Sequence, residues 1–174
     1  MKNNLNIDNP SIYVANLGAY VAGRLIGEWL DLTKFNDVED LAKEVDRIAN
    51  KNLVLYGDEW AIHDYSNFPD LGENPNLEDV IKVSKLIQQL HNGYAAVKGF
   101  LDNWSVEDLD YFEESFCGAY SSFKEYAEQL FDDTMEVPEH LTSYIDYDAF
   151  SRDLSFDYHE APAPDCETFV YRSF

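Results

Sequence analysis

The feature that most constrains this chain is a large acidic excess in a stretch that is also rich in aromatic residues. Thirty-four Asp and Glu residues stand against 12 Lys and Arg, a formal net charge of −22. Residues 102–174 hold 19 acidic and 3 basic side chains, a net charge of −16. Low hydrophobicity with high charge is typical of disordered segments, but 45% of this chain is hydrophobic and 15% aromatic. We therefore expect a folded protein whose negative surface opposes its own compaction.

The composition also restricts location and partners. The chain contains no 18-residue apolar run of the kind that spans a bilayer, and Met1–Ile7 lacks the apolar stretch of a signal peptide. Two cysteines, Cys117 and Cys166, fit a reducing compartment. We expect a soluble cytoplasmic protein. Its surface would repel duplex DNA and anionic membranes, so its partners should be basic: a nucleic-acid-binding protein, a cationic cleft or metal ions.

The first 72 residues predict a small antiparallel sheet that carries one helix. Runs rich in β-branched and aromatic residues, separated by glycine or polar residues, predict four strands at residues 11–17, 24–32, 53–56 and 59–65. The helix is predicted to follow Asn36, with Glu39 at the capping-box position and apolar residues at helical spacing as far as Ile48. A segment with two prolines and a glycine, residues 67–76, is the first predicted boundary.

The rest of the chain predicts mostly helices. Residues 77–90 and 94–101 form a helical middle piece, and Asn92 and Gly93 lie between the two helices as a C-cap pair. Further helices are predicted at residues 105–117 and 122–131, after Pro138 and after Asp146, followed by strands at 155–158 and 168–171. The predicted fold class is α+β, with three small domains at residues 1–72, 73–104 and 105–174.

The acidic residues of the last domain have a helical spacing. Glu107, Asp110 and Glu114 follow three- and four-residue steps and would share a ridge of the helix 105–117. Neighbours on such a ridge lie about 5–6 Å apart at Cβ, on the scale that separates successive phosphates of a nucleic acid. The candidate phosphate-mimicking set is Glu107, Asp110, Glu114, Glu125, Glu128, Asp132, Asp133, Glu136 and Asp148.

Two interpretations of this set stay open. Most charge runs are solvated faces, but ordinary surfaces mix signs because like charges at i,i+4 are mildly destabilising. Between Asp102 and Asp153 only Lys124 and Arg152 interrupt the negative charge. A decoy for a DNA-binding cleft would need this pattern.

Several motifs resemble those of one known family. They are residues 12–15, 23–29, 59–65, 116–120, 125–134 and 144–154. In this order they resemble the ArdA antirestriction proteins, most specifically through Glu59-Trp-Ala-Ile-His-Asp-Tyr65. The resemblance implies a protein of mobile elements that mimics B-form DNA and occupies the DNA-binding groove of type I restriction-modification enzymes. It also implies an elongated fold of three small domains and a homodimer formed through the C-terminal domain. Because the acidic surface repels duplex DNA, we expect no direct binding of nucleic acid.

The remaining candidate sites favour structural roles. The chain has no His-x-x-x-His or Cys-x-x-Cys spacing, no phosphate-binding glycine loop and no nucleophile motif, so we expect no metal, no cofactor and no enzymatic activity. Strand alternation would place His63 and Asp64 on opposite faces, which argues against acid–base chemistry. Cys117 is expected in the core and Cys166 as a free thiol. The residues expected at a dimer interface are Tyr144, Tyr147, Arg152, Tyr158 and Tyr171.

Two other functions remain open from the residues alone. The chain could be an acidic interaction module or chaperone for basic DNA-binding proteins, which would bind cationic partners without preference for a DNA-shaped cleft. It could also be a metal-dependent hydrolase that uses its carboxylate clusters, although carboxylates are so abundant here that no single pair is informative.

Overall fold

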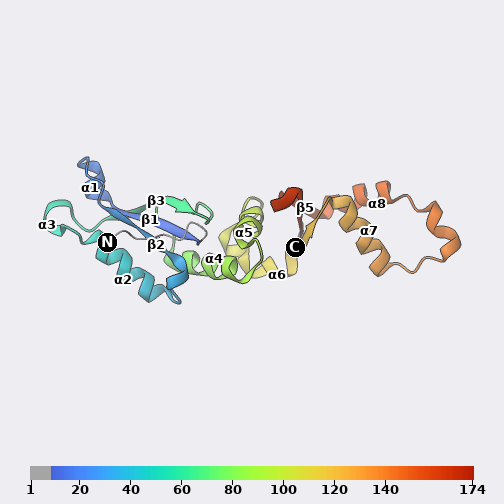
Figure 1. Cartoon of the computed structure of the whole chain (residues 1–174), viewed down its shortest axis with the longest axis horizontal. Helices are drawn as coiled ribbons and strands as arrows, with labels where there is room; N and C mark the ends of the chain where they lie inside the picture. Colours follow the sequence, from blue (N-terminus) through green and yellow to red (C-terminus); the bar gives the residue numbers. More distant parts are fainter. Residues whose placement is uncertain (1–8) are drawn as a thin grey trace. The chain divides into compact units, whose positions relative to one another are not determined.

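The computed structural model describes residues 9–174, and these divide into two compact units, an N-terminal unit that ends at Lys98 and a C-terminal unit of residues 99–174 (Figure 1). Each unit contains a three-stranded antiparallel sheet and several helices, so the predicted α+β class is confirmed. The three-domain division with boundaries near residues 72 and 104 stays a prediction. The prediction about a signal peptide falls on residues 1–7, outside the described residues. No helix in the described part is both long and apolar enough to cross a bilayer.

The sheet of the N-terminal unit has the order β2-β1-β3, with β1 (Ser11–Asn16) between β2 (Gly27–Asp31) and β3 (Trp60–Ser66). The register with β1 shifts within β3, because Tyr13 pairs with Asp64 whereas Val14 pairs with Ile62. His63 is therefore an extra residue that interrupts the strict alternation we had expected at 59–65. Its ring packs edge-on against Tyr20 at a centroid distance of 4.6 Å, a structural contact.

Helix α2 (Val38–Ala49) covers one face of this sheet (Figure 1) and buries Leu41, Val45 and Ile48. The predicted cap at Asn36 is wrong by one residue, because the Asp37 carboxylate accepts the hydrogen bond from the Asp40 N–H, at 2.9 Å. Helix α4 (Leu77–Gln89) packs against α2 and against the 3-10 helix η1 (Leu32–Lys34). Helix α5 (Gly93–Leu101) follows a turn in which Asn92 has a positive φ of 55°.

The predicted strand at 53–56 is wrong, because these residues form the one-turn helix α3 (Leu53–Tyr56). Left-handed Asn52 (φ 61°) and Gly57 (φ 75°) bracket this turn and prevent an extended run. The predicted link between β1 and β2 also contains a short helix, α1 (Leu17–Val21), so that β2 begins later than expected. Helix α1 contacts α3 so closely that a Cβ on Gly18 would lie 1.9 Å from the Tyr56 carbonyl oxygen.

A buried amide fixes these short helices in place. The Asn16 Oδ1 accepts a hydrogen bond from the Ala19 N–H (2.7 Å) and caps α1. Its Nδ2 donates to the carbonyl oxygens of Ala49 (2.6 Å), at the end of α2, and Gly57 (2.9 Å), after α3. One side chain therefore satisfies the backbone of three separate segments.

The sheet of the C-terminal unit has the order β4-β6-β5, formed by β4 (Phe116–Tyr120), β5 (Tyr158–Pro162) and the central strand β6 (Thr168–Arg172). Aromatic rings fill the core beside this sheet. The ring centroids of Phe100 and Phe112 lie 5.3 Å apart, and those of Phe116 and the fully buried Tyr171 lie 5.5 Å apart. Gly99 is needed next to this core, because a Cβ there would lie 2.6 Å from the Ala161 Cβ and 2.7 Å from the Tyr171 hydroxyl oxygen.

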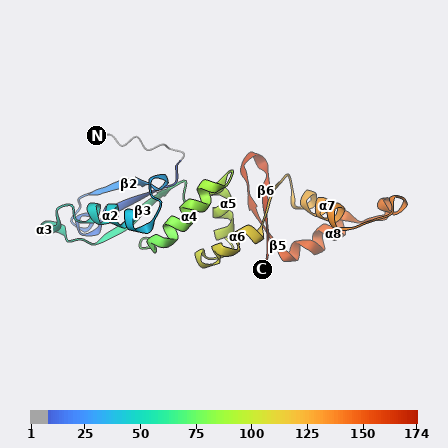
Figure 2. The ribbon, with the colours of Figure 1, turned by 90° about the horizontal axis from the view of Figure 1, so that it is seen from below.

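Helix α7 (Phe123–Thr134) packs on β4 and β6. It also pairs with α8 (Tyr147–Leu154), which lies beside it in Figure 2. Both begin at predicted capping residues, since Ser122 and Asp146 accept hydrogen bonds from the N–H groups of Glu125 and Ala149. The 3-10 helix η3 (Glu139–Tyr144) follows Pro138. The predicted strand at 155–158 is wrong at its start, because η4 (Ser155–Asp157) precedes β5, and η5 (Pro164–Cys166) joins β5 to β6.

The predicted continuous helix at 105–117 is also wrong. The chain forms the 3-10 helix η2 (Val106–Tyr111), the single turn α6 (Phe112–Ser115) and then β4. Asp108 accepts hydrogen bonds from the N–H and hydroxyl of Ser105 (2.9 and 2.8 Å), which starts a tight turn. Phe116 pairs with Tyr171 in the sheet, so the backbone must be extended where the helix was expected to end.

Candidate acidic binding surface

Helix α7 carries an α-helical ridge of carboxylates, of the kind predicted for Glu107, Asp110 and Glu114 in residues 105–117. Glu125, Glu128 and Asp132 follow three- and four-residue steps of a true α-helix, so their Cβ atoms are neighbours about 5–6 Å apart. The opposite side of the helix buries Phe123, Tyr126 and Ala127 against the sheet. Burial of the apolar face therefore determines which side of α7 presents carboxylates to solvent.

The first part of the predicted set has a different geometry. Glu107 and Asp110 lie three residues apart in η2, where side chains at this spacing eclipse each other, and Glu114 follows in α6. The prediction that these three carboxylates share one α-helical ridge is therefore wrong. Glu107 and Asp110 form a pair on the 3-10 helix, and Glu114 lies on a separate helical turn. Of the nine predicted carboxylates, eight are exposed, and Glu128 is half-buried.

One lysine partly neutralises the surface. Lys124 Nζ lies 2.5 Å from Asp148 Oδ1 and 3.8 Å from Glu128 Oε1, so it links α7 to α8. The hydrogen bond from Lys124 lowers the pKa of Asp148, and the same contact raises the pKa of the lysine. Both groups stay charged at neutral pH, and the local negative charge is reduced at this point.

Other members of the set also have partners within the unit. Glu125 accepts hydrogen bonds from the N–H and hydroxyl of Ser121 (2.7 and 2.6 Å), which lowers its pKa. Asp132 accepts one from the Tyr147 hydroxyl (3.2 Å). Four carboxylates form no hydrogen bond or ion pair with any described residue: Glu107, Glu114, Asp133 and Glu136. These four are available to a partner without loss of a hydrogen bond or ion pair to the described part of the chain.

The residues predicted for a dimer interface differ in accessibility. Tyr171 is fully buried, and Tyr158 packs with Tyr126 at 5.2 Å, so these two side chains belong to the core of the unit. Tyr144 is 82% exposed. Tyr147 packs on Phe131, and the Arg152 Nε lies 3.4 Å from Asp153 Oδ1. A dimer interface formed by these five residues stays a prediction.

The two cysteines differ in environment. Cys117 is half-buried beside the apolar cluster of α7 and accepts a hydrogen bond from the Tyr126 hydroxyl at 3.5 Å. Cys166 is a free, exposed thiol. Within residues 9–174, no three His, Cys, Asp or Glu side chains are grouped closely enough to hold a metal ion.

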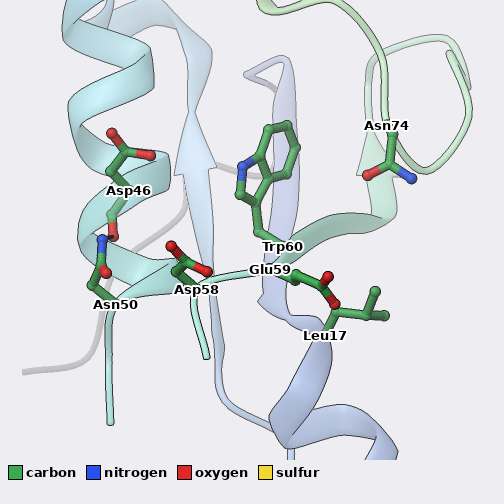
Figure 3. A pocket seen from close by; sticks show the side chains of 7 residues that line it. All are labelled: Leu17, Asp46, Asn50, Asp58, Glu59, Trp60 and Asn74. Carbon is green, nitrogen blue, oxygen red and sulfur yellow. Dashed lines mark hydrogen bonds between the residues drawn. The ribbon is translucent and has the colours of Figure 1, made fainter. Parts of the chain in front are cut away.

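The N-terminal unit contains a groove of about 750 Å³ that sequence reasoning did not find (Figure 3). Its lining residues are Leu17, Asp46, Asn50, Asp58, Glu59, Trp60 and Asn74. They come from α1, from α2 and its C-cap residue Asn50, from the approach to β3, from β3 itself and from the loop after it. No local sequence pattern links residues so dispersed along the chain.

Two sheet-and-helix units and a surface of mostly exposed carboxylates define an acidic α+β protein suited to cationic partners. A family model described as antirestriction protein (ArdA) matches residues 12–163 of this chain. The match covers most of the sequence, and the chain belongs to the ArdA antirestriction family, as the motif resemblance had indicated. Membership implies that the protein acts in antirestriction. A search of curated proteins found no match.

Proposed function

We propose that this chain protects DNA by inhibiting type I restriction-modification enzymes as a non-enzymatic mimic of B-form DNA. It would occupy the DNA-binding groove of the methyltransferase core, in the cytoplasm of a cell that receives a mobile element. The observation that supports this most is the charge of residues 99–174, where 19 acidic side chains stand against 3 basic ones. Two of those three, Lys124 and Arg152, are already next to carboxylates.

The total charge has a suitable magnitude. B-form DNA carries about one negative charge per 1.7 Å of its axis, so a net charge of −22 matches roughly 11 base pairs at full density. A homodimer would match about 22 base pairs by the same spacing. We propose that such a dimer forms through the C-terminal unit, where Tyr144, Tyr147 and Arg152 reach the surface.

The mechanism is electrostatic and needs no cofactor. Arginine and lysine side chains that normally contact phosphates would contact carboxylates instead. DNA gains much of its affinity from the release of condensed counterions. Carboxylates that are sparser than phosphates condense fewer counterions, and Lys124 reduces the local charge further. The affinity of the protein for the enzyme should therefore depend less steeply on salt than the affinity of DNA does.

A competition experiment tests the proposal. Binding of the chain and of duplex DNA to a purified type I methyltransferase core would be measured at several salt concentrations. We expect the chain to displace the duplex, with a shallower slope of log affinity against log salt. A steeper slope than that of DNA would contradict the mechanism. Equal binding to a basic protein without a DNA groove would instead favour an acidic module or chaperone for basic DNA-binding proteins.

A further inference from the structure

The N-terminal unit exposes apolar side chains that mimicry of phosphates does not require. Val54 is 98% exposed and Val21 80% exposed. The full set of large apolar residues exposed in this region is Tyr20, Val21, Leu25, Leu53, Val54 and Leu55. Single exposed apolar residues are normal, but a concentration of them in one region of a soluble protein marks an interaction site. We call this set the apolar surface.

The apolar surface is carried by segments that are held together. It occupies α1, the residues after α1, and α3, and the two helices are in contact where Gly18 meets Tyr56. The hydrogen bonds of the buried Asn16 fix both segments. Residues 17–25 and 52–57 contain one charged side chain, Arg24, in a chain that is 26% charged. A partner that covers this region must therefore itself be largely apolar.

The groove described above adjoins the apolar surface. Leu17, the first residue of α1, lines the groove, and its N–H donates a hydrogen bond to the Glu59 carbonyl oxygen at 2.8 Å. Asp58 lies just after Gly57, which ends α3. One bound segment could therefore contact the apolar surface and enter the groove.

The chemistry of the groove selects a flat organic cation. Figure 3 shows the Trp60 indole standing between Asn74 on one side and Asp46 on the other, with Asp58 and Glu59 near its base. The three carboxylates form no ion pair with any described residue, since the nearby Arg47 and Lys51 bind Glu28 instead. A guanidinium stacks on an indole face and donates several hydrogen bonds to carboxylates in its plane. The groove volume of about 750 Å³ is large enough for an arginine side chain.

We propose that this surface binds a protein segment that presents one arginine beside apolar side chains. The guanidinium enters the groove over Trp60 and pairs with the carboxylates, and the neighbouring apolar side chains cover α1 and α3. The negative charge of the groove favours the arginine of such a segment, and the apolar surface beside the groove favours its apolar side chains. The site lies in the other unit from the carboxylates assigned to DNA mimicry and does not depend on that function.

A titration with a defined peptide tests the proposal. The probe is an acetylated and amidated peptide with one arginine between leucines, and the matched control replaces arginine by citrulline, which has nearly the same shape and no charge. The readout is the indole N–H resonance of Trp60 in the ¹⁵N-labelled full chain, assigned with the variant Trp60→Phe. We expect a saturable shift with an affinity at least about tenfold higher for the arginine peptide.

A pair of surface variants tests the apolar contribution. Val54→Ser should weaken binding of the arginine peptide by about three- to tenfold because it removes exposed apolar area from the interface. Phe156→Ser changes a side chain that is 83% exposed in the other unit and should leave peptide binding unchanged. Both residues are exposed, so folding should be preserved. Equal affinity for the two peptides, no saturable shift, or an equal effect of the two variants would overturn the proposal.

Val54→Ser also separates this proposal from DNA mimicry. The variant should compete with duplex DNA as well as the unmodified chain does. If the unmodified chain fails to displace duplex DNA but still binds the arginine peptide, the proposed function fails and this inference stands.

Discussion

Four carboxylates of the C-terminal unit can be neutralised without removing any internal hydrogen bond or ion pair described above. They are Glu107, Glu114, Asp133 and Glu136. Replacing each by its amide keeps size and polarity. All four replacements together change the net charge of residues 99–174 from −16 to −12. Since these side chains form no hydrogen bond or ion pair with residues 9–174, the free energy of unfolding should stay the same or rise as self-repulsion falls.

The exposure of these residues sets the expected size of the effect. An exposed charge pair contributes about 0.2–1 kcal/mol, and about 1.4 kcal/mol corresponds to a tenfold change in affinity. A single amide substitution should therefore weaken inhibition less than about fivefold. Four independent substitutions would amount to about 0.8–4 kcal/mol, or roughly four-fold to several-hundred-fold.

The assay is competition against duplex DNA for a type I methyltransferase core. The matched control neutralises four carboxylates of the N-terminal unit that also lack a side-chain hydrogen bond or ion pair among the described residues: Glu39, Glu73, Glu78 and Asp79. Both quadruple variants have the same total charge. We expect the C-terminal set to have the larger effect. If one amide substitution abolished inhibition in a folded protein, the model of distributed charge would be refuted. If both quadruple variants lost the same amount of inhibition, the assignment of the binding surface to the C-terminal unit would be refuted.

Two further predictions concern stability. Gly99→Ala places a methyl group 2.6 Å from the Ala161 Cβ. We expect the free energy of unfolding, measured in urea, to fall by about 1–2 kcal/mol after the gain in helix propensity, and to recover in part in Gly99→Ala/Ala161→Gly. A Gly99→Ala protein as stable as the parent would contradict this. Arg47 and Lys51 hold the pKa of Glu28 at about 2, below its ordinary value of 4.5, so its stabilising contribution is complete above that ordinary value and is lost as the pH falls through 2. The difference in unfolding free energy between the parent and Glu28→Gln should thus shrink as the pH falls from about 5 to about 2, and a difference independent of pH would be inconsistent with this assignment.

The sequence predicted those elements whose signals are local. The helices after Ser122 and Asp146 begin where a capping side chain precedes an apolar periodicity, and the same holds for α4 after Asn76. Residues 105–117 show helical spacing as well, but Phe116 is recruited into a strand by pairing with Tyr171, far along the chain. Local periodicity carries no information about such a distant partner.

The candidate sites follow the same division. Exposure of the acidic residues could be anticipated from the apolar faces of the helices, whereas the ridge on 105–117 failed once that helix was broken. The groove around Trp60 could not be anticipated, because strand pairing and two one-turn helices bring its walls together. Residues 53–56 form a helical turn and no strand because Asn52 and Gly57 adopt positive φ values on either side of them. The sequence pattern did not identify these two as turn residues.

The buried Asn16 marks a limit to how acidic this protein can become. Aspartate has almost the same shape as asparagine and is tolerated over most of the surface of this chain. At position 16 its second oxygen would face the carbonyl oxygens of Ala49 and Gly57, where the native amide nitrogen donates to both. In this buried position, repulsion between the carboxylate and the two carbonyl oxygens would then replace two hydrogen bonds. A lineage that accumulates negative charge outside is therefore constrained to keep a neutral, two-sided hydrogen-bonding group at this interior point.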